Sequence, residues 1–397
     1  MRLSWKYRIE NSLGTLITTC ACLAIISITL LFIMKQKSDV RGPLRKTGSF
    51  WPIGSRRTEA TNPEIGSGPG ESLSMPSDVS VSIIICTCNR AAELQQTLEA
   101  LGKVRIPSGW KAEAVVVDNG STDGTATVAR DTKLLNLKAR YLYQPQKGKS
   151  NALNAGLTEA RGEIILTTDD DVIVPEDWVE QMVFPIINGG YDAVIGRIRP
   201  APHLLRAWLT PTHRSMIASN EETEVHNGTY EFIGASMGFR RSALERVPAF
   251  DPELGPGALG LGEDTLFGWQ LVEAGSKIGY APATAVQHHF DPSRLRRTIW
   301  LGEARKHGRT AAYIRYHWKH EDLRHPRLAW FKHWAKLQVR RILQPPPPLE
   351  AEGCPAWEVS YVLQMELCRQ FCLERRRPRN YSRRGLAKRV DGARTGF

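Results

Sequence analysis

The pattern of hydrophobic and polar residues becomes regular at Val79, and from there it predicts strands that alternate with helices. Apolar runs at 81–87, 114–118, 139–143 and 164–168 predict buried strands, and stretches with helical spacing lie between them. Alternation of this kind is typical of a mostly parallel sheet with helices on both faces. The ligand of such a sheet binds beyond the carboxyl ends of its strands. We therefore predict an α/β fold with its site at that edge.

Polar residues collect where the predicted strands end. The fourth strand delivers three consecutive carboxylates, Asp169, Asp170 and Asp171, and the earlier strand ends carry Thr87, Asn89, Arg90 and Asp118. Adjacent carboxylates repel one another, so a cation must offset them, and a hard divalent cation with oxygen ligands does this well. A solvated acidic loop is the alternative for the three carboxylates, and a helix cap is the alternative for Asp118.

An uncharged stretch near the N-terminus predicts a membrane anchor. Residues 13–34 would span roughly 33 Å as a helix, which is enough to cross a bilayer. A cleaved signal peptide is the alternative, but no small-residue cleavage site follows. More basic residues follow the span than precede it, which favours a cytoplasmic location for the rest of the chain. Residues 35–79 are rich in Gly, Pro, Ser and charge and are predicted to form a flexible tether.

Charge is concentrated at the two ends of the 397-residue chain. The net charge is +12, yet much of the excess lies outside the regular part of the sequence and is not interleaved with aromatic residues. This distribution argues against a nucleic-acid partner and favours a membrane surface. Residues 375–397 carry nine Lys and Arg against Asp391. We expect this tail to bind an anionic leaflet, and a disordered tail without function is the alternative.

The C-terminal part of the chain has three helical patterns. They cover 292–317, 325–343 and 357–373, and Pro345 to Pro348 separate the last two. The middle pattern contains Trp330, Phe331 and Trp334 and is predicted to be either a packed helix or a membrane contact.

Several motifs together resemble the family 2 glycosyltransferases with the GT-A fold. They are Thr87-x-Asn89-Arg90, Asp118-Asn119-Gly120-Ser121, Lys147-Gly148 with Asn154 and Gly156, Asp169-x-Asp171, the segment 232–241 and Gly262-Glu263-Asp264. Each motif is weak alone, but their order and spacing make chance agreement improbable. The resemblance covers about 80–297. It departs at Leu153, where the family often has Arg on the phosphate side.

The resemblance implies a role for each residue on the donor side. Thr87, Asn89 and Arg90 would hold the base and ribose, and a surface ion pair is the alternative for Arg90. Asp118 would accept from the imide N–H of a uracil or thymine. Two lysines at a helix start, Lys147 and Lys149, could contact phosphate, with a solvated basic loop as the alternative. Asp169 and Asp170 would lie toward the ribose and the metal.

The resemblance also implies a metal centre and a catalytic base. Asp171 would bind Mn²⁺ or Mg²⁺, and His288 would be a further ligand; a hydrogen-bonded structural histidine is the alternative. Asp264 would be the base, with Gly234, Ala235 and Glu263 on the acceptor side. Glu263 and Asp264 could instead simply complement the N-terminus of the helix they begin.

The function implied is that of a metal-dependent, inverting glycosyltransferase. It would move a sugar from a UDP- or dTDP-type donor to a hydroxyl acceptor in the synthesis of cell-surface polysaccharide or glycolipid. A lipid-linked acceptor would suit a single-pass membrane protein with a basic tail. The Gln-x-x-Arg-Trp motif of processive members has no match near Arg297. We therefore expect one sugar to be added per binding event.

Two other classes stay open from the sequence. A non-catalytic nucleotide-sugar-binding scaffold would not need Glu263 and Asp264. A sugar-nucleotide pyrophosphorylase should have a Gly-rich loop with Arg directly after the first strand, unlike residues 86–90. The predicted organisation is an N-terminal segment (1–12), a transmembrane helix (13–34), a tether (35–79), a GT-A domain (80–300), a helical extension (301–343), a Pro-rich linker (344–349) and a helix with a basic tail (350–397).

Overall fold

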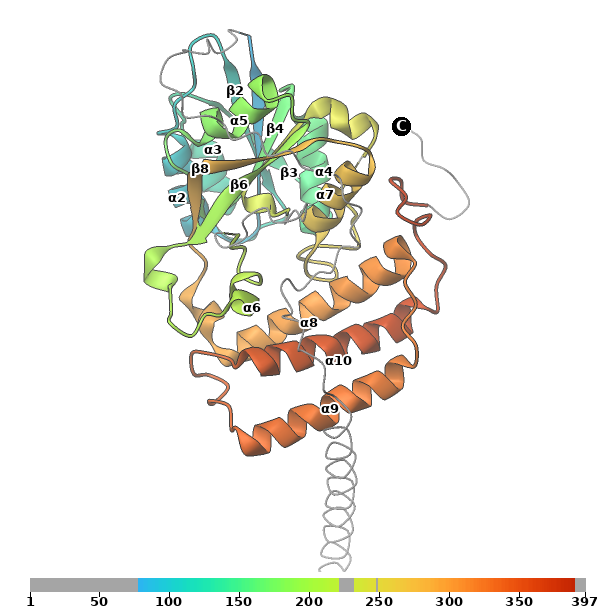
Figure 1. Ribbon diagram of the computed structural model, residues 1–397. Helices are drawn as coiled ribbons and strands as arrows, with labels where there is room; N and C mark the ends of the chain where they lie inside the picture. The colour runs from blue at the N-terminus through green and yellow to red at the C-terminus, as the bar shows by residue number, and fades with distance from the viewer. Residues whose placement is uncertain (1–77, 221–231, 248, 390–397) are drawn as a thin grey trace, which may run out of the picture.

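The computed structural model describes residues 78–220, 232–247 and 249–389 (Figure 1). The predicted membrane helix and nearly all of the tether lie outside these ranges, as do the last residues of the basic tail. No helix within the described ranges is long and apolar enough to cross a membrane. The predicted single-pass anchor therefore stays a prediction.

One mixed sheet organises the domain. Its order is β3-β2-β1-β4-β7-β6-β8-β5, and the first four of these strands are parallel. The strands are β1 (Ser80–Thr87), β2 (Lys111–Asp118), β3 (Lys138–Tyr143), β4 (Ile164–Asp169), β5 (Val172–Ile173), β6 (Ala193–Pro200), β7 (Met237–Arg240) and β8 (Ile278–His288). β7 runs antiparallel to both of its neighbours. All four strands predicted from the apolar runs are present, and the α/β class is confirmed.

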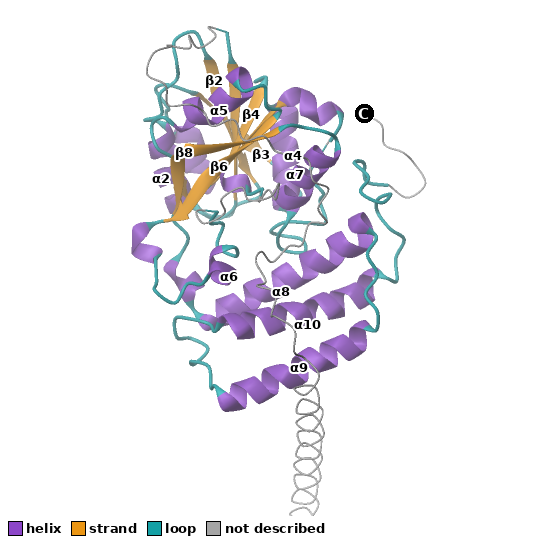
Figure 2. Ribbon diagram, viewed as in Figure 1, coloured by secondary structure: helices purple, strands orange, loops and turns teal. Residues whose placement is uncertain are grey.

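Helices cover both faces of the sheet (Figure 2). These helices are α2 (Ala91–Leu101), α3 (Thr125–Asp131), α4 (Lys149–Glu159), α5 (Trp178–Asn188) and α7 (Glu263–Glu273), whereas the short α6 (Pro211–Arg214) lies below the sheet (Figure 1). Side chains alternate along β1, so Ile83 and Ile85 pack with α2 and α5, while Ile84 packs with α4 and α7. Both faces of the strand are therefore apolar, which is why it appears in the sequence as an unbroken hydrophobic run.

Strand β7 was not predicted, and its short sequence explains why. It has four residues and includes Gly238, a residue that strands usually lack. A Cβ on Gly238 would lie 2.7 Å from a side-chain carbon of Leu166 in β4, so the close approach of the two strands requires glycine here. The antiparallel pairing of β7 with β4 brings the segment that follows Phe232 to the end of β4.

Three long helices follow the sheet and stack on one another below it (Figure 1). They are α8 (Arg297–Tyr313), α9 (Pro326–Leu343) and α10 (Ala356–Glu374), close to the predicted helices, and a π-helical turn (Ile314–Lys319) extends α8. α10 lies between α8 and α9 and packs against both. Arg297 binds both carboxylate oxygens of the buried Glu358, which fixes the start of α8 on α10.

The chain after α10 returns to the α/β domain. Lys388 Nζ lies 2.6 Å from Oδ1 of the buried Asp251, and the hydroxyl of Tyr381 donates to Oδ2 of the same carboxylate at 2.7 Å. The Tyr313 hydroxyl, from the end of α8, donates to that oxygen as well. Part of the predicted basic tail is thus a strap that ties the helices to the loop preceding α7.

Candidate active site

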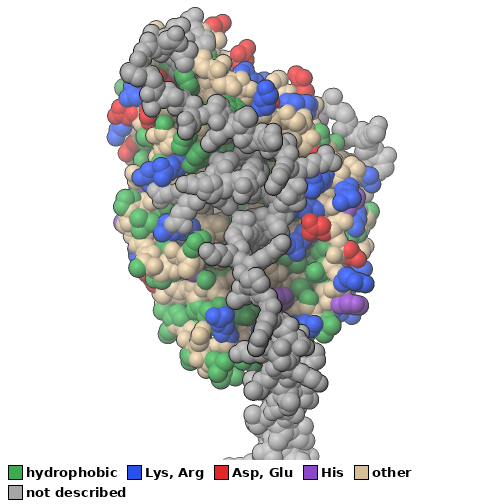
Figure 3. All heavy atoms as spheres, viewed as in Figure 1, with side chains coloured by type: hydrophobic (Ala, Val, Ile, Leu, Met, Phe, Trp, Pro, Cys, Tyr) green, Lys and Arg blue, Asp and Glu red, His purple; other side chains and the backbone are tan. Residues whose placement is uncertain are grey.

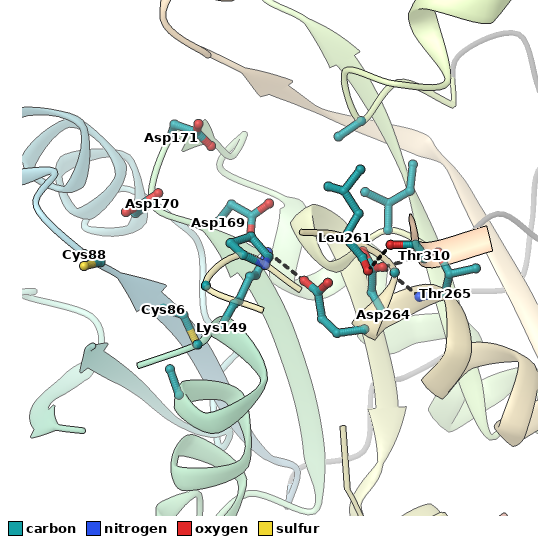
Figure 4. Close-up of a pocket in the computed structure, with 18 of the residues that line it drawn as sticks. Cys86, Cys88, Lys149, Asp169, Asp170, Asp171, Leu261, Asp264, Thr265 and Thr310 are labelled. Atoms are coloured by element: carbon teal, nitrogen blue, oxygen red, sulfur yellow. Dashed lines mark hydrogen bonds and ion pairs between the residues drawn. The ribbon is translucent and has the colours of Figure 1, made fainter. Parts of the chain in front are cut away.

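A crevice of about 480 Å³ opens beyond the carboxyl ends of β1 and β4, where the strand pattern predicted a site. One wall carries the three carboxylates at the end of β4, and the other carries the start of α7 and part of α8. Figure 4 shows Asp169, Asp170 and Asp171 on one side and Asp264, Thr265 and Thr310 on the other. The fold therefore brings together residues that are about a hundred positions apart in the sequence.

Arg90 forms ion pairs with two of the three carboxylates. Its Nη1 lies 3.1 Å from Oδ1 of Asp170 and 2.6 Å from Oδ2 of Asp171. Burial raises the pKa of Asp170 to about 7, although the charge of Arg90 opposes this shift. The sequence left open a surface ion pair for Arg90, and the structure shows an ion pair with these acidic residues inside the crevice.

Asp171 and His288 face each other at the base of this wall. Nε2 of His288 lies 3.3 Å from Oδ1 of Asp171, and both side chains are buried. Nδ1 of His288 lies 2.8 Å from the carbonyl oxygen of Ile217, which can only accept, so Nδ1 carries a proton. In the neutral ring, Nε2 then presents a lone pair toward a carboxylate oxygen. A proton on Nε2 or a metal cation between the two atoms would remove the repulsion between these electron pairs.

This arrangement fits two ligands of a divalent metal. The hydrogen bond from Nδ1 is the support that metal-binding histidines usually have. Burial opposes ionisation of Asp171, but His288 and Arg90 hold the pKa of this carboxyl well below its ordinary range. No group of three or more His, Cys, Asp or Glu suited to a metal occurs in the described part of the chain.

Lys149 occupies the centre of the crevice. Its Nζ lies 2.5 Å from Oδ1 of Asp169 and 3.6 Å from Oε1 of Glu263, so it links the two walls (Figure 4). Burial opposes protonation, but Asp169, Glu263 and Asp264 hold the pKa of Lys149 well above its ordinary value. The sequence pointed to both Lys147 and Lys149 as candidates for contact with phosphate. In the structure, Lys147 donates to the carbonyl oxygens of Asn119 and Gly120 at the rim of the crevice.

Asp264 is held in a fixed orientation at the start of α7. The backbone N–H of Gly234 donates to Oδ2 at 2.8 Å, and the N–H of Thr265 donates to Oδ1 at 2.7 Å. The hydroxyl of Thr167 in β4 donates to the carbonyl oxygen of Gly234, and that of Thr168 donates to Ala235. The segment of Gly234 and Ala235 therefore positions Asp264 against the strand that carries the acidic residues.

Burial sets the protonation behaviour of the acidic pair that begins α7. It raises the pKa of Asp264, while Lys149 and the N–H of Gly234 oppose this shift. It also raises the pKa of the deeply buried Glu263 to about 7, with Asp264 adding to the shift. A carboxylate with a raised pKa is a stronger proton acceptor than an ordinary one.

The other residues predicted to contact the donor, apart from Arg90, are at or near the ends of β1 and β2. Thr87 lines the crevice, whereas Asn89 and Asp118 are not among its lining residues. Asn89 has a positive φ of 54° and accepts from the N–H of Thr122, so it ties the end of β1 to the turn after β2. Both carboxylate oxygens of Asp118 accept hydrogen bonds, one from the N–H of Ser121 and one from the Tyr141 hydroxyl. The proposed contact of Asp118 with a base stays a prediction.

Some lining residues were not predicted from the sequence. The crevice is also lined by Met216, Trp269, His307 and Thr310. His307 and Thr310 come from α8, which follows the sheet and contains no motif that would indicate a site. Their position depends on how α8 packs against the loop before α7, where the hydroxyl of Thr310 donates to the carbonyl oxygen of Leu261.

The match to known proteins agrees with this geometry. Residues 82–247 match the family model described as glycosyl transferase family 2. Over these residues the chain is similar to the family 2 glycosyltransferases. The matched segment contains the nucleotide-side motifs and Asp171, while Asp264 and His288 lie beyond the matched residues.

Two curated proteins illustrate the extent of the similarity. The poly-β-1,6-N-acetyl-D-glucosamine synthase of Staphylococcus epidermidis is 27% identical over 207 residues, which cover 51% of this chain and 48% of that protein. The glycosyltransferase AglE of Haloferax volcanii is 36% identical over 120 residues, covering 30% of this chain and 39% of that protein. This chain therefore spans about half or less of the length of these relatives.

Among solved structures, one similar fold is the mannosyltransferase PcManGT of Pyrobaculum calidifontis in complex with GDP-Man and Mn²⁺. It is 20% identical, with a TM-score of 0.47, and the alignment covers 72% of this chain and 84% of that one.

Proposed function

We propose that the protein transfers a sugar from a nucleoside diphosphate sugar to a hydroxyl acceptor with inversion at the anomeric carbon. One observation carries this proposal: the carboxylates that end β4 and the carboxylate of Asp264 line facing walls of one crevice in a chain similar to the family 2 glycosyltransferases. A donor bound at the first wall would present the sugar to an acceptor at the second. A single base suffices for this reaction, because inversion needs no covalent intermediate.

The donor would lie along the ends of β1 and β2. Thr87, Asn119 and Gly148 line this part of the crevice, and Lys147 extends over its rim. Two cations, Arg90 and Lys149, face the position proposed for the diphosphate and can offset its charge. We propose a UDP- or dTDP-type donor, with Asp118 as the acceptor of a hydrogen bond from the base.

The metal would be held by Asp171 and His288, and Mn²⁺ or Mg²⁺ fits their hard oxygen and nitrogen donors. When bound, such a cation supplies Lewis-acid stabilisation of the negative charge on the leaving diphosphate. Arg90 contacts both Asp170 and Asp171, and it would adjust its position when a bound cation adds positive charge at these carboxylates.

Asp264 is proposed as the general base. The acceptor hydroxyl would transfer its proton to a carboxylate oxygen of Asp264, and its oxygen would attack the anomeric carbon. The bond from that carbon to the diphosphate would break, and its electron pair would leave with the diphosphate. The N–H groups of Gly234 and Thr265 hold the carboxylate in place for this transfer.

Two features favour catalysis over the other classes considered. A nucleotide-sugar-binding scaffold has no need for a partly buried, oriented carboxylate opposite the donor, yet Asp264 is held by two backbone N–H groups. In a pyrophosphorylase, a Gly-rich loop after the first strand would be expected, whereas here β1 is followed by Cys88, Asn89 and Arg90. We propose a role in polysaccharide or glycolipid synthesis at a membrane, with the catalytic domain on the cytoplasmic side and a lipid-linked acceptor as one candidate.

The experiment that tests this function uses the full chain with a panel of UDP-, dTDP- and GDP-sugars. Binding is measured first, by the rise in unfolding temperature with and without Mn²⁺, because a ligand stabilises the folded state to which it binds. Release of nucleoside diphosphate is then measured with total lipid extracts as acceptors. Turnover that needs both a donor and Asp264 supports the proposal. Binding without turnover in any extract would favour the scaffold, and release of sugar 1-phosphate would favour the pyrophosphorylase.

A further inference from the structure

Helix α9 is the outermost helix of the C-terminal stack, and it packs on the rest of the protein through one side only. α10 separates it from α8 (Figure 1). Leu337 is buried on the packed side, the ring of His333 lies 6.2 Å from that of Tyr361 in α10, and Arg341 binds Glu358. These contacts hold α9 firmly and determine which of its side chains point away from α10.

The outward side of α9 is apolar. Leu328, Phe331 and Ile342 are exposed by 52%, 44% and 67%, and Leu343 at the end of the helix is exposed by 74%. With 3.6 residues per turn, Leu328, Phe331 and Ile342 lie within about 60° of one another around the helix axis. Figure 3 shows hydrophobic side chains gathered at the lower end of the molecule, where Figure 1 places α9. A stripe of this kind on an exposed helix marks an interaction surface.

The charge of α9 is entirely positive. Its 18 residues include no Asp or Glu. Arg327, Lys332 and Lys336 are exposed beside the apolar stripe, and none of them forms an ion pair within the described ranges. Arg341, by contrast, is paired with Glu358. The cations next to the stripe are thus available to an anionic partner.

Aromatic rings lie at the edge of the same surface. Trp330 stacks on Trp334 at 6.5 Å, and Phe331 stacks on Trp334 at 5.5 Å. The two tryptophans are half-buried, so their rings bridge the packed and the outward sides of α9. Indole rings with one apolar and one polar edge favour the boundary between a hydrocarbon layer and water.

We infer that the outward side of α9 lies on a membrane surface that contains anionic lipid. An apolar stripe flanked by unpaired Lys and Arg and by tryptophan is the pattern of a helix that lies in the plane of the interface. A second copy of this chain is a poorer occupant, because its α9 would bring the same uncompensated positive charge to the contact. This inference concerns a surface remote from the crevice and does not depend on the proposed reaction.

The position of α9 leaves the crevice accessible. α8 lines the crevice, and α10 separates α8 from α9. Two helix-to-helix spacings of 8–10 Å place α8 roughly 20 Å from the α9 surface. Docking through α9 would therefore hold the crevice near the lipid headgroups without covering its lining.

The test measures amide hydrogen exchange of the full chain in detergent, in nanodiscs of phosphatidylcholine and in nanodiscs rich in phosphatidylglycerol. We expect amides of 326–343 to exchange about tenfold more slowly in the anionic nanodiscs, the factor expected for a ligand at ten times its Kd. High salt should reverse much of this protection, because screening weakens the attraction. Reading the exchange at α9 itself separates this contact from any effect of the N-terminal segment.

Two paired variants identify the cause. One variant combines Leu328→Ser with Phe331→Ser, and the other combines Lys332→Gln with Lys336→Gln. Each should abolish the protection of α9 without lowering the unfolding temperature, because all four side chains are exposed. Leu135→Ser and the pair Lys103→Gln with Lys133→Gln are the matched controls at exposed positions of the α/β domain and should leave the protection unchanged. Equal exchange of α9 in all three environments would overturn the inference. Protection that depends on protein concentration in detergent would also overturn it and would assign the surface to a second copy.

Discussion

Nη1 of Arg90 lies 2.6 Å from Oδ2 of Asp171, on the same carboxylate whose Oδ1 faces Nε2 of His288 at 3.3 Å. Arg90 follows β1 and Asp171 follows β4, two strands that pair in parallel register. The arginine therefore supplies positive charge at the place where the proposed metal would bind. It follows that metal affinity reflects a balance between the cation and Arg90 at one buried carboxylate.

The first prediction concerns that carboxylate. Asp171→Asn should abolish the part of nucleotide diphosphate binding that depends on Mn²⁺, because an amide oxygen carries no charge and is a weak ligand. Titration calorimetry with UDP, in Mn²⁺ and in EDTA, measures the effect. The matched control is Asp131→Asn at an exposed position at the end of α3, which should bind like the parent protein. Unchanged Mn²⁺-dependent binding by Asp171→Asn would remove Asp171 from the metal site.

The second prediction concerns the base. Asp264→Asn should lower turnover by roughly 10²-fold or more and leave the donor KM nearly unchanged, since general base catalysis typically contributes this much. The activity of the parent protein should fall as the pH decreases through the raised pKa of Asp264, because the base must be ionised. Steady-state kinetics over a pH series measures both effects. Glu245→Gln at an exposed position is the control, and a near-normal turnover for Asp264→Asn would assign the base elsewhere.

The third prediction concerns stability and pH. Burial raises the pKa of Glu263 from 4.5 to about 7, so between these values the folded chain holds a proton that the unfolded chain releases. The free energy of unfolding should therefore fall as the pH rises through this window and stay lower above it. At 1.4 kcal/mol for each pKa unit, the fall is at most about 3.5 kcal/mol.

Glu263→Gln cannot ionise and should show a smaller fall. Urea unfolding in EDTA at the two ends of the window measures the difference. Glu245→Gln, which removes an exposed carboxyl, should show the same change of unfolding free energy with pH as the parent protein. If the unfolding free energy of Glu263→Gln changed with pH as much as that of the parent protein, another group would be responsible for the pH dependence.

The fourth prediction concerns the strap after α10. Lys388→Met removes the cation from the buried carboxylate of Asp251 and leaves it with the hydroxyls of Tyr313 and Tyr381. A hydrogen bond to a charged group contributes about 1.5–3 kcal/mol, so the free energy of unfolding should fall by roughly that amount. Urea unfolding measures it, with Arg383→Met at an exposed position of the strap as the control. Equal stability of the two variants would mean that the strap is not anchored through Lys388.

Much of the donor half of the molecule could be predicted from local patterns. Strands β1, β2 and β4 are buried on both faces, so they appear in the sequence as continuous apolar runs. Once these runs are located, the polar residues at their ends are identified as well. The helices of the C-terminal stack have a helical hydrophobic period and were also found within a few residues. β7 was not predicted, because a four-residue strand that contains glycine has no recognisable hydrophobic pattern of its own.

The position of Lys149, rather than Lys147, between the two walls was not predicted for a different reason, and the same holds for the contributions of His307 and Thr310. Lys147 and Lys149 are equivalent in the sequence, and only the packing of α4 directs one of them between Asp169 and Glu263 while the other reaches the rim. His307 and Thr310 lie on a helix that the pattern assigned mainly to a separate extension.

By itself, the sequence determined the α/β class, the order of the motifs and the chemical identity of the groups at each strand end, because backbone periodicity and side-chain chemistry are local properties. The tertiary structure alone decided which of these groups meet. It placed Asp264 opposite Asp169 across one crevice and paired Arg90 with Asp171. It also turned one side of α9 outward while the other packs on α10. Such contacts depend on how distant elements pack together, and no local pattern encodes that packing.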